Sequence, residues 1–260
     1  MQKFLSLIVL CFVAFSFNPL AAQKTKKAGE YYQLTIYRFT SPEQEKILDE
    51  HLKNYFIPAL HKSGIKTVGV FKAIANDTAA LKSLYVLVPV KSLNAISEIS
   101  QRLMADKNLN NSDYINTAYN SPAYSRMETI ILKSFHLASK MNTPILKSSR
   151  ADRVYELRSY ESPSEKMFRN KLHMFNEGGE TAIFKKLNFN AVFYGEVIAG
   201  SRMPNLMYMT SFENMEDRKA HWKSFSSDPD WKKLSGREAY KNNVSKIDIT
   251  FLRPADYSDF

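Results

Sequence analysis

The pattern of hydrophobic and polar positions repeats itself along the chain. Residues 32–37 read Tyr-Gln-Leu-Thr-Ile-Tyr, and residues 155–160 read Tyr-Glu-Leu-Arg-Ser-Tyr, a shift of 123 positions. At the same shift, the apolar triplet 84–86 returns as residues 207–209. Self-similarity at a fixed offset is typical of a duplicated structural unit. We therefore expect two copies of one unit.

Each copy predicts the same order of elements. Strands are indicated by short apolar or alternating runs bounded by turn residues, and helices by apolar residues three or four positions apart. The order is β-α-β-β-α-β, which is the ferredoxin-like arrangement of a four-stranded antiparallel sheet with both helices on one face. The expected fold class is α+β. The strands are expected at 32–37, 67–74, 84–90 and 127–135, and again at 155–160, 191–198, 206–212 and 246–252.

Each copy also carries a helix-start signal after its first strand. Residues 41–44 read Ser-Pro-Glu-Gln and residues 162–165 read Ser-Pro-Ser-Glu. A serine hydroxyl at the N-cap accepts a free backbone N–H, proline suits the first helical position, and Gln or Glu three residues after the cap completes a capping box. The helices that follow are expected to be interrupted at Pro58 and at Gly178-Gly179.

The first strand alternates between two faces. Tyr32, Leu34 and Ile36 share one face, and Gln33, Thr35 and Tyr37 share the other. Helices cover one side of such a sheet. The face with Gln33, Thr35 and Tyr37 therefore requires another layer if it is buried. The two copies facing each other would supply that layer, whereas a solvated face would need none.

Several residues of the second copy resemble the NIPSNAP family. The opening strand 155–160 fits that resemblance, and the remaining motif residues are Asn205-Leu206-Met207-Tyr208-Met209, Phe212, Arg218, Trp222, Phe225 and Asp228-Pro229-Asp230-Trp231. The first copy resembles the family less, because Ile96 and Ser100 stand near the places of Arg218 and Trp222. The resemblance implies dimeric α/β-barrel domains, in which two ferredoxin-like sheets pack face to face. It implies little about activity.

The start of the chain reads as a secretory signal. Lys3 precedes a run from Phe4 to Phe17 without a charged residue, and cleavage is expected after Ala22. The run is shorter than the roughly 20 residues of a membrane-spanning helix. We expect an exported, periplasmic or extracellular protein, soluble and without stable membrane insertion. The predicted organisation is a signal at 1–22, domains at 23–137 and 153–260, and a linker at 138–152.

Composition and charge exclude some classes of function. The 260 residues carry a formal charge of +10 and one cysteine, Cys11, which lies inside the signal, so the mature chain has no thiol chemistry. Residues 23–150 hold 18 Lys and Arg against 10 Asp and Glu, whereas residues 151–260 hold 17 against 16. The basic half favours an anionic partner or is a solvated surface. Nucleic-acid motifs are absent, and we expect no nucleic-acid partner.

Arg218 and Trp222 are the first candidates for a ligand site. They share a helix face with Met215, so Arg218 is expected to point inward and to need an anion or acceptors. One interpretation is a ligand carboxylate or phosphate on Arg218 with Trp222 stacked beside it. The other is a structural ion pair with a carboxylate such as Glu156, with Trp222 as a core anchor.

Tyr155, Tyr32 and His51 complete the candidate ligand-binding set. No catalytic residue is assigned, because Gly-x-Ser-x-Gly and phosphate-loop patterns are absent. No metal site and no cofactor are expected, since the histidines lie ten or more residues apart in sequence. Asp228-Pro229 is interpreted as an N-cap followed by proline at the first helical position.

The leading hypothesis is an exported, NIPSNAP-like, non-catalytic or weakly catalytic protein. It would bind a small anionic or aromatic ligand, or act as a homo-oligomeric interaction module. The alternative is a cofactor-independent or haem-dependent oxidoreductase of the dimeric α/β-barrel type, with monooxygenase-like chemistry where the five candidate residues converge. Adhesion to anionic surfaces through the basic half is a third hypothesis.

Overall fold

The structure is a computed structural model, and it describes residues 29–260. The predicted signal at 1–22 lies outside these residues. Among the residues described, no helix is long and apolar enough to cross a membrane.

The first half contains the predicted β-α-β-β-α-β order with short additions. A π-helix (η1) lies between the first two α-helices, and two 3-10 turns (η2, η3) lie in the connections. Its elements are β1 (Tyr31–Phe39), α1 (Pro42–His51), η1 (Leu52–Phe56), α2 (Ile57–Lys62), β2 (Gly69–Ala73), η2 (Ile74–Asp77), β3 (Lys82–Val90), α3 (Leu93–Ala105), η3 (Leu109–Asn111) and β4 (Arg126–Ser134).

The second half repeats this order after residues 138–152, which contain no named helix or strand. An additional helix and a 3-10 turn precede its last strand. Its elements are β5 (Val154–Glu161), α4 (Glu165–Phe175), α5 (Glu180–Lys186), β6 (Phe193–Ala199), β7 (Asn205–Phe212), α6 (Met215–Ser227), α7 (Pro229–Ser235), η4 (Glu238–Tyr240) and β8 (Lys246–Pro254).

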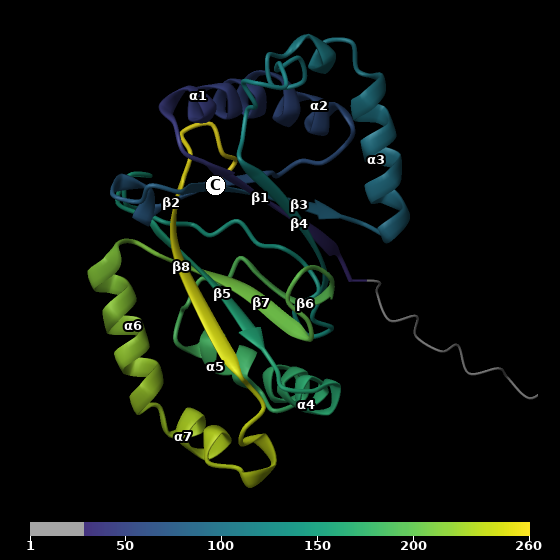
Figure 1. The fold of residues 1–260 in the computed structure, drawn as a ribbon. Coiled ribbons are helices and arrows are strands. Elements are labelled where there is room, and N and C mark those ends of the chain that lie inside the picture. The colour runs from purple at the N-terminus through teal and green to yellow at the C-terminus, as the bar shows by residue number, and fades with distance from the viewer. Residues whose placement is uncertain (1–28) are drawn as a thin grey trace, which may run out of the picture.

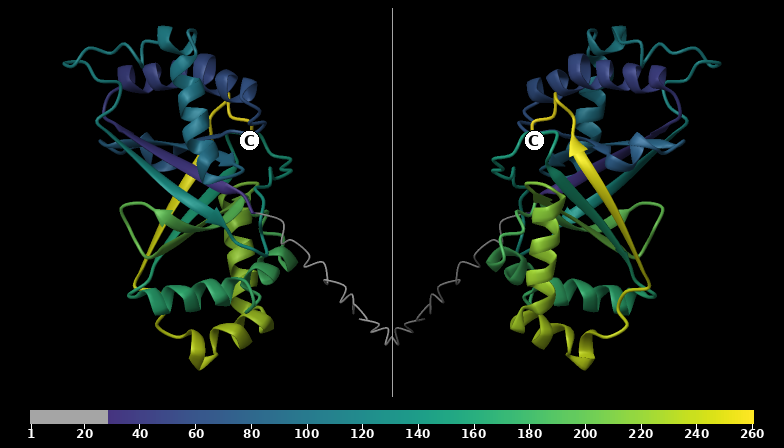
Figure 2. Two further views of the ribbon diagram at one scale, coloured as in Figure 1. Left: turned by 90° about the vertical axis from the view of Figure 1, so that its right-hand side faces the viewer. Right: turned by 90° about the vertical axis from the view of Figure 1, so that its left-hand side faces the viewer.

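The eight strands form one closed antiparallel barrel. Their order is β1-β3-β2-β8-β5-β7-β6-β4, so each half contributes a ferredoxin-like sheet, and the pairs β2–β8 and β4–β6 join the sheets. The helices of the first half lie on one side of the strands and those of the second half on the opposite side (Figures 1 and 2). The prediction that the two copies face each other is confirmed, and the barrel closes within one chain.

The face of β1 that points toward the other half is not the one that the sequence predicted, which carries Gln33, Thr35 and Tyr37. Tyr32, Leu34 and Ile36 belong to the core inside the barrel, whereas Tyr37 packs in the layer under the first-half helices. The apolar face therefore fills the inter-sheet space, and the more polar face lies under helices. The reason is that strands enclose the barrel interior on all sides, and a cluster of hydrophobic side chains fills its centre.

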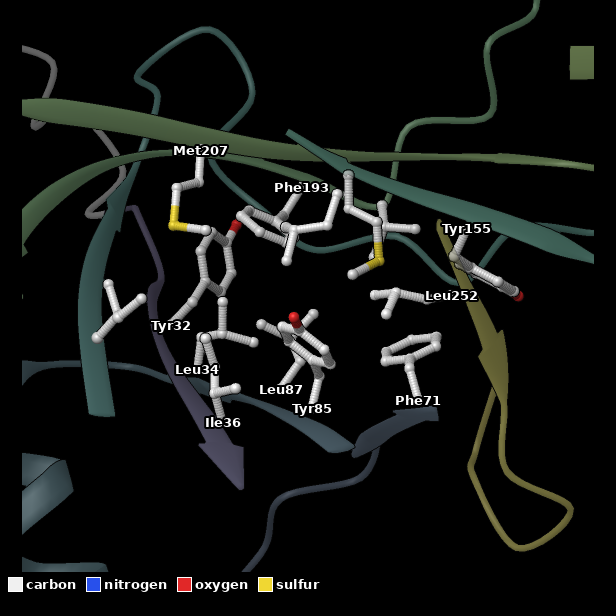
Figure 3. Close-up of a cluster of buried hydrophobic side chains, with 14 of the residues drawn as sticks. Tyr32, Leu34, Ile36, Phe71, Tyr85, Leu87, Tyr155, Phe193, Met207 and Leu252 are labelled. Atoms are coloured by element: carbon white, nitrogen blue, oxygen red, sulfur yellow. The ribbon is translucent and has the colours of Figure 1, made fainter. Parts of the chain in front are cut away.

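Inside the barrel, a tyrosine of each half packs on a phenylalanine of the other half. Tyr32 of β1 packs on Phe193 of β6 with ring centroids 5.2 Å apart, and its equivalent Tyr155 of β5 packs on Phe71 of β2 at 4.9 Å. Figure 3 shows these rings among the aliphatic side chains. A Cβ on Gly69 would lie 2.5 Å from the Phe71 ring, so a larger residue there would displace it.

The strand register corrects the repeat offset by one residue. Tyr32 pairs with Pro89 and its equivalent Tyr155 pairs with Ser211, so β3 and β7 correspond at a shift of 122 rather than 123. Tyr85 is therefore equivalent to Met207, not to Tyr208. Tyr85 and Met207 both lie inside the barrel, whereas Tyr208 lies in the second helical layer. A one-residue slip exchanges the two faces of a strand.

Two helix predictions also need correction. The N-cap of α4 is Ser164, whose hydroxyl accepts the Met167 N–H, because the Ser162 hydroxyl is already donating to the Asn243 carbonyl at 2.7 Å. In the first half the helix is not interrupted at Pro58, because the π-helix η1 continues directly into α2. Pro58 occupies the first turn of α2, where a missing N–H is tolerated.

Two other capping predictions are confirmed. Ser41 caps α1 by accepting the N–H of Gln44. Asp228 caps α7 by accepting the N–H groups of Asp230 and Trp231, with Pro229 at the first helical position.

Candidate functional site

The five residues predicted from the sequence fall in three separate places. Arg218 and Trp222 lie on the side of α6 that faces the sheet, Tyr32 and Tyr155 lie inside the barrel, and His51 lies at the end of α1. The sheet separates the barrel interior from both helical layers. The expected convergence of all five residues in one cavity is therefore wrong.

Glu156 is the centre of the cluster that contains Arg218. This carboxylate is fully buried and accepts two hydrogen bonds from the Arg218 guanidinium, at 2.9 and 3.0 Å. Arg158 Nε donates to it at 2.6 Å and Trp222 Nε1 at 2.8 Å. The Arg158 guanidinium also stacks on the Trp222 ring, 3.7 Å from its centroid. An anionic ligand would need these same donors, and Glu156 already uses them. The structure therefore agrees with the second interpretation of the sequence, a structural ion pair between Arg218 and Glu156.

The electrostatics of Glu156 follow from these contacts. Burial by itself would raise the pKa of the carboxyl group, but the hydrogen bond from Arg218 and the charge of Arg158 outweigh burial, so the pKa lies below its ordinary value. Glu156 is therefore ionised and fully paired at neutral pH. Such a group is suited to holding α6 against the sheet.

A second buried ion pair lies in the same layer. Lys171 Nζ is 3.0 Å from Glu180 Oε2, and the two side chains are 6% and 3% exposed. Burial raises the pKa of Glu180 despite the neighbouring Lys171. The sequence analysis missed this pair, because the two residues are on different helices and nothing in their spacing links them.

His51 is buried against the loop that contains Ser112 and Tyr114. Its Nδ1 lies 2.9 Å from the Ser112 hydroxyl oxygen, and its ring stacks on Tyr114 at a centroid distance of 4.1 Å. Burial lowers the pKa of His51 to about 4, so the imidazole is neutral at neutral pH. His51 does not line the cavity described below.

Tyr32 and Tyr155 place two hydroxyl groups inside the barrel. Both hydroxyl oxygens are buried and form no hydrogen bond with any residue in the 29–260 range. Burial raises the pKa of both phenols, so each remains protonated. They close the end of the barrel at which β1 and β5 begin.

The opposite end of the barrel is open. A cavity of about 640 Å³ lies where β1 and β5 end, and all eight strands contribute residues to its wall. Its floor is apolar, with Ile36, Ile130, Leu157 and Met207 among the lining residues. This volume lies within the range of small-molecule sites, roughly 300–1,000 Å³. We call this cavity the barrel mouth.

Polar side chains line the outer part of the barrel mouth. Those on strands are Arg38, Ser83, Glu128, Ser159, Asn205, Asp248 and Thr250, and the β6–β7 turn adds Ser201 and Arg202. Ser159 and Asn205 hydrogen-bond to each other at 2.9 Å. The Asn76 side chain pairs with both backbone groups of Ser83, at 2.9 and 2.8 Å, and so fixes η2 beside the opening.

The sequence contained a signal for this site. Arg38 follows Tyr32, Leu34 and Ile36 at steps of two, so a charged residue continues the apolar face of β1. A charge on a core-facing position is the kind of exception that marks a functional site. The sequence analysis did not use it, because this face was expected to lie under helices.

The architecture defines a tandem dimeric α/β barrel, and three solved structures share it over most of the chain. A candidate monooxygenase from Lactobacillus acidophilus is 12% identical with a TM-score of 0.56, covering 87% of this chain and 94% of that one. A candidate monooxygenase from Fusobacterium nucleatum is 8% identical with a TM-score of 0.57, covering 87% and 93%. An anthrone oxidase-like protein is 8% identical with a TM-score of 0.51, covering 88% and 93%. At these identities the likeness concerns the fold.

Residues 155–259 form a NIPSNAP domain, since they match that family. A NIPSNAP family protein from Agrobacterium tumefaciens is 21% identical with a TM-score of 0.36, and the match covers 41% of this chain and 96% of that one. Among curated proteins, none matches the chain significantly. The resemblance predicted from the second copy is thus confirmed.

Proposed function

We propose that the protein binds a small molecule with an apolar body in the barrel mouth. The observation that supports this proposal is the cavity of about 640 Å³, whose floor is apolar and whose outer part carries polar side chains. A few polar groups that orient a ligand above an apolar floor are typical of binding sites. The ligand hypothesis of the sequence analysis is therefore kept, but its site moves from Arg218 and Trp222 to the barrel mouth.

The cavity is formed by a single chain. Strands of both halves line it, and β2–β8 and β4–β6 close the barrel without a second copy. The proposed binding thus needs no homo-oligomer. Export to the periplasm or the extracellular space remains part of the proposal, on the basis of residues 1–22.

The direct test is to fill the barrel mouth. Thr250 is on the inward face of β8, so Thr250→Trp should occupy the opening, whereas Ile247→Trp adds the same bulk on the outward face of β8, away from the lining residues. The probe is N-phenyl-1-naphthylamine, a neutral dye whose fluorescence rises in apolar sites. We expect saturable binding by the wild-type protein and by Ile247→Trp, and affinity weakened about tenfold or more, or over 1.4 kcal/mol, by Thr250→Trp.

Circular dichroism and melting temperature show that each variant is folded. The proposal is wrong if the wild-type protein shows no saturable binding. It is also wrong if Thr250→Trp binds the dye as tightly as Ile247→Trp does.

The oxidoreductase alternative rests on the names of the full-length structural neighbours, two of which are described as candidate monooxygenases. The barrel mouth offers haem no histidine ligand, and the buried His51 is hydrogen-bonded to Ser112. A cofactor-independent oxygenase would consume oxygen with a phenol or quinol substrate, and oxygen uptake that Thr250→Trp abolishes would support it.

A further inference from the structure

Arg38 is a charged residue on the inner face of the barrel. It ends the run Tyr32, Leu34 and Ile36 on β1, is half-buried and lines the barrel mouth. Its cross-strand neighbour on β4 is Arg126, a like charge directly opposite. Like charges at opposed positions destabilise a sheet, and a half-buried guanidinium needs acceptors. Arg38 is thus placed where an anion would stabilise the fold.

The acidic groups of the barrel mouth are engaged elsewhere. Asp248 pairs with Arg202, which also lies 3.9 Å from Glu161, and Glu128 accepts a hydrogen bond from Ser201. The Arg38 side chain forms no hydrogen bond and no ion pair within residues 29–260. The position equivalent to Arg38 in the second half is Glu161, which has Arg202 as its cation. Only one of the two equivalent positions therefore has a partner of opposite charge in the described chain.

Two further donors lie beside Arg38 on the same face. Ser83 is paired with Arg38 across β1 and β3, and Tyr85 is paired with Ile36. The Tyr85 hydroxyl points into the group of side chains inside the barrel (Figure 3), and it has no hydrogen-bond partner in the described part of the chain. A guanidinium fork and a phenol hydroxyl on neighbouring strands both offer hydrogens to one acceptor. A carboxylate can accept both.

We infer that the ligand of the barrel mouth is an amphipathic carboxylate, held at Arg38 and Tyr85 with its apolar body against Leu157 and Met207. This inference rests on the proposed function and adds the chemical class and orientation of the ligand. Arg38 binds the carboxylate with its fork, and the Tyr85 hydroxyl donates a further hydrogen bond. The apolar body covers the floor that water would otherwise contact.

The test uses a matched pair of probes, 4-phenylbutyrate and 4-phenylbutyramide, which share the apolar body and differ in charge. Isothermal titration calorimetry measures both on the wild-type protein, Arg38→Gln, Tyr85→Phe and Arg126→Gln. Arg126→Gln is the control, because it removes one positive charge from the neighbouring exposed position outside the lining residues.

We expect the wild-type protein to bind the carboxylate at least about tenfold more tightly than the amide, as the loss of a charge-assisted hydrogen bond implies. Arg38→Gln should weaken carboxylate binding about 10- to 100-fold and leave amide binding within about twofold. Tyr85→Phe should weaken carboxylate binding by a smaller factor. Arg126→Gln should change neither probe by more than about twofold at physiological salt.

Equal binding of the two probes by the wild-type protein would overturn the inference. So would an equal loss of carboxylate affinity in Arg38→Gln and Arg126→Gln, since that result indicates a general effect of charge. Both of these outcomes leave the proposed function intact, provided that Thr250→Trp still blocks the apolar dye. If neither probe nor the dye binds the wild-type protein, the proposed function fails and this inference fails with it.

Discussion

The two halves of the molecule have the same backbone arrangement but fill their helical layers differently. Under the second-half helices, Glu156 binds Arg158, Arg218 and Trp222 in one buried cluster. Under the first-half helices the layer is mostly aliphatic, and the buried His51 beside it is neutral. Gln33 is at the position equivalent to Glu156, and Thr35 at that of Arg158. One fold thus accepts a charged or an apolar layer.

The comparison shows what a buried charge requires. In the second half, each donor around Glu156 has an acceptor, so that the cost of burying the charges is offset by hydrogen bonds. In the first half, Ile96 and Ser100 replace the arginine and tryptophan of α6, and no carboxylate is buried at the equivalent position. The cluster is therefore a unit: the charges are retained or replaced together.

Glu156→Ala should have the largest effect on stability. It leaves Arg158 and Arg218 buried or half-buried without their acceptor, at an expected cost of about 3–5 kcal/mol in the free energy of unfolding. Gln33→Ala, at the equivalent position of the first half, should cost less than about 1 kcal/mol. Urea denaturation at pH 7 measures both. Similar costs at the two positions would contradict the difference between the layers.

His51 should make the stability depend on pH in a window of its own. Its pKa is about 4 in the folded state against an ordinary 6.5, so the unfolded chain takes up a proton first as the pH falls. Stability from this group is complete above pH 6.5 and is lost between 6.5 and about 4. The loss amounts to about 3 kcal/mol at about 1.36 kcal/mol per pKa unit. Glu156, whose pKa is lowered, loses its contribution below 4.5, the ordinary value.

Urea denaturation of His51→Asn between pH 7 and 4 tests this expectation. Asparagine retains a polar group toward Ser112 but does not titrate, so the variant should show a flatter pH dependence than the wild-type protein. His136→Asn, at a half-exposed histidine, is the control for the loss of one imidazole. An unchanged slope in His51→Asn would mean that His51 titrates normally in the folded state.

Tyr32→Phe and Tyr155→Phe should have the smallest effects, and similar ones. Each removes a buried hydroxyl without a hydrogen-bond partner in the described chain and retains the ring that packs on Phe193 or Phe71. Thermal denaturation should show a change between neutral and about 1 kcal/mol stabilising in each half. A loss of stability in only one variant would show that the Tyr32–Phe193 and Tyr155–Phe71 contacts are not equivalent.

Much of the fold could be predicted from local patterns. The alternation of β1, the apolar run of β7 and the caps Ser41 and Asp228 are each encoded within a few neighbouring residues, so the element order and the duplication were clear. The predictions that failed depended on contacts with distant residues. Ser162 does not cap α4 because its hydroxyl bonds Asn243, and the true register of β7 is set by its pairing with β5.

The candidate site was less predictable than the fold. Arg218 and Trp222 were correctly placed on one inward face of α6, but the sequence left open whether a ligand or Glu156 meets them. The barrel mouth was not anticipated, since its wall combines residues from all eight strands. Arg38 was visible as a charge on an apolar face, yet its surroundings depend on which face the barrel encloses.

By itself the sequence determined a duplicated β-α-β-β-α-β unit, because strand and helix periodicities and end caps act over short distances. The motif residues of its second copy carried the resemblance to the NIPSNAP family. Only the tertiary structure decided that the barrel closes within one chain and that the strand faces bearing Tyr32 and Tyr155 turn inward. It also decided that Arg218 donates its hydrogen bonds to Glu156. These outcomes depend on which sheets and side chains meet, and residues more than sixty positions apart meet only after the chain has folded.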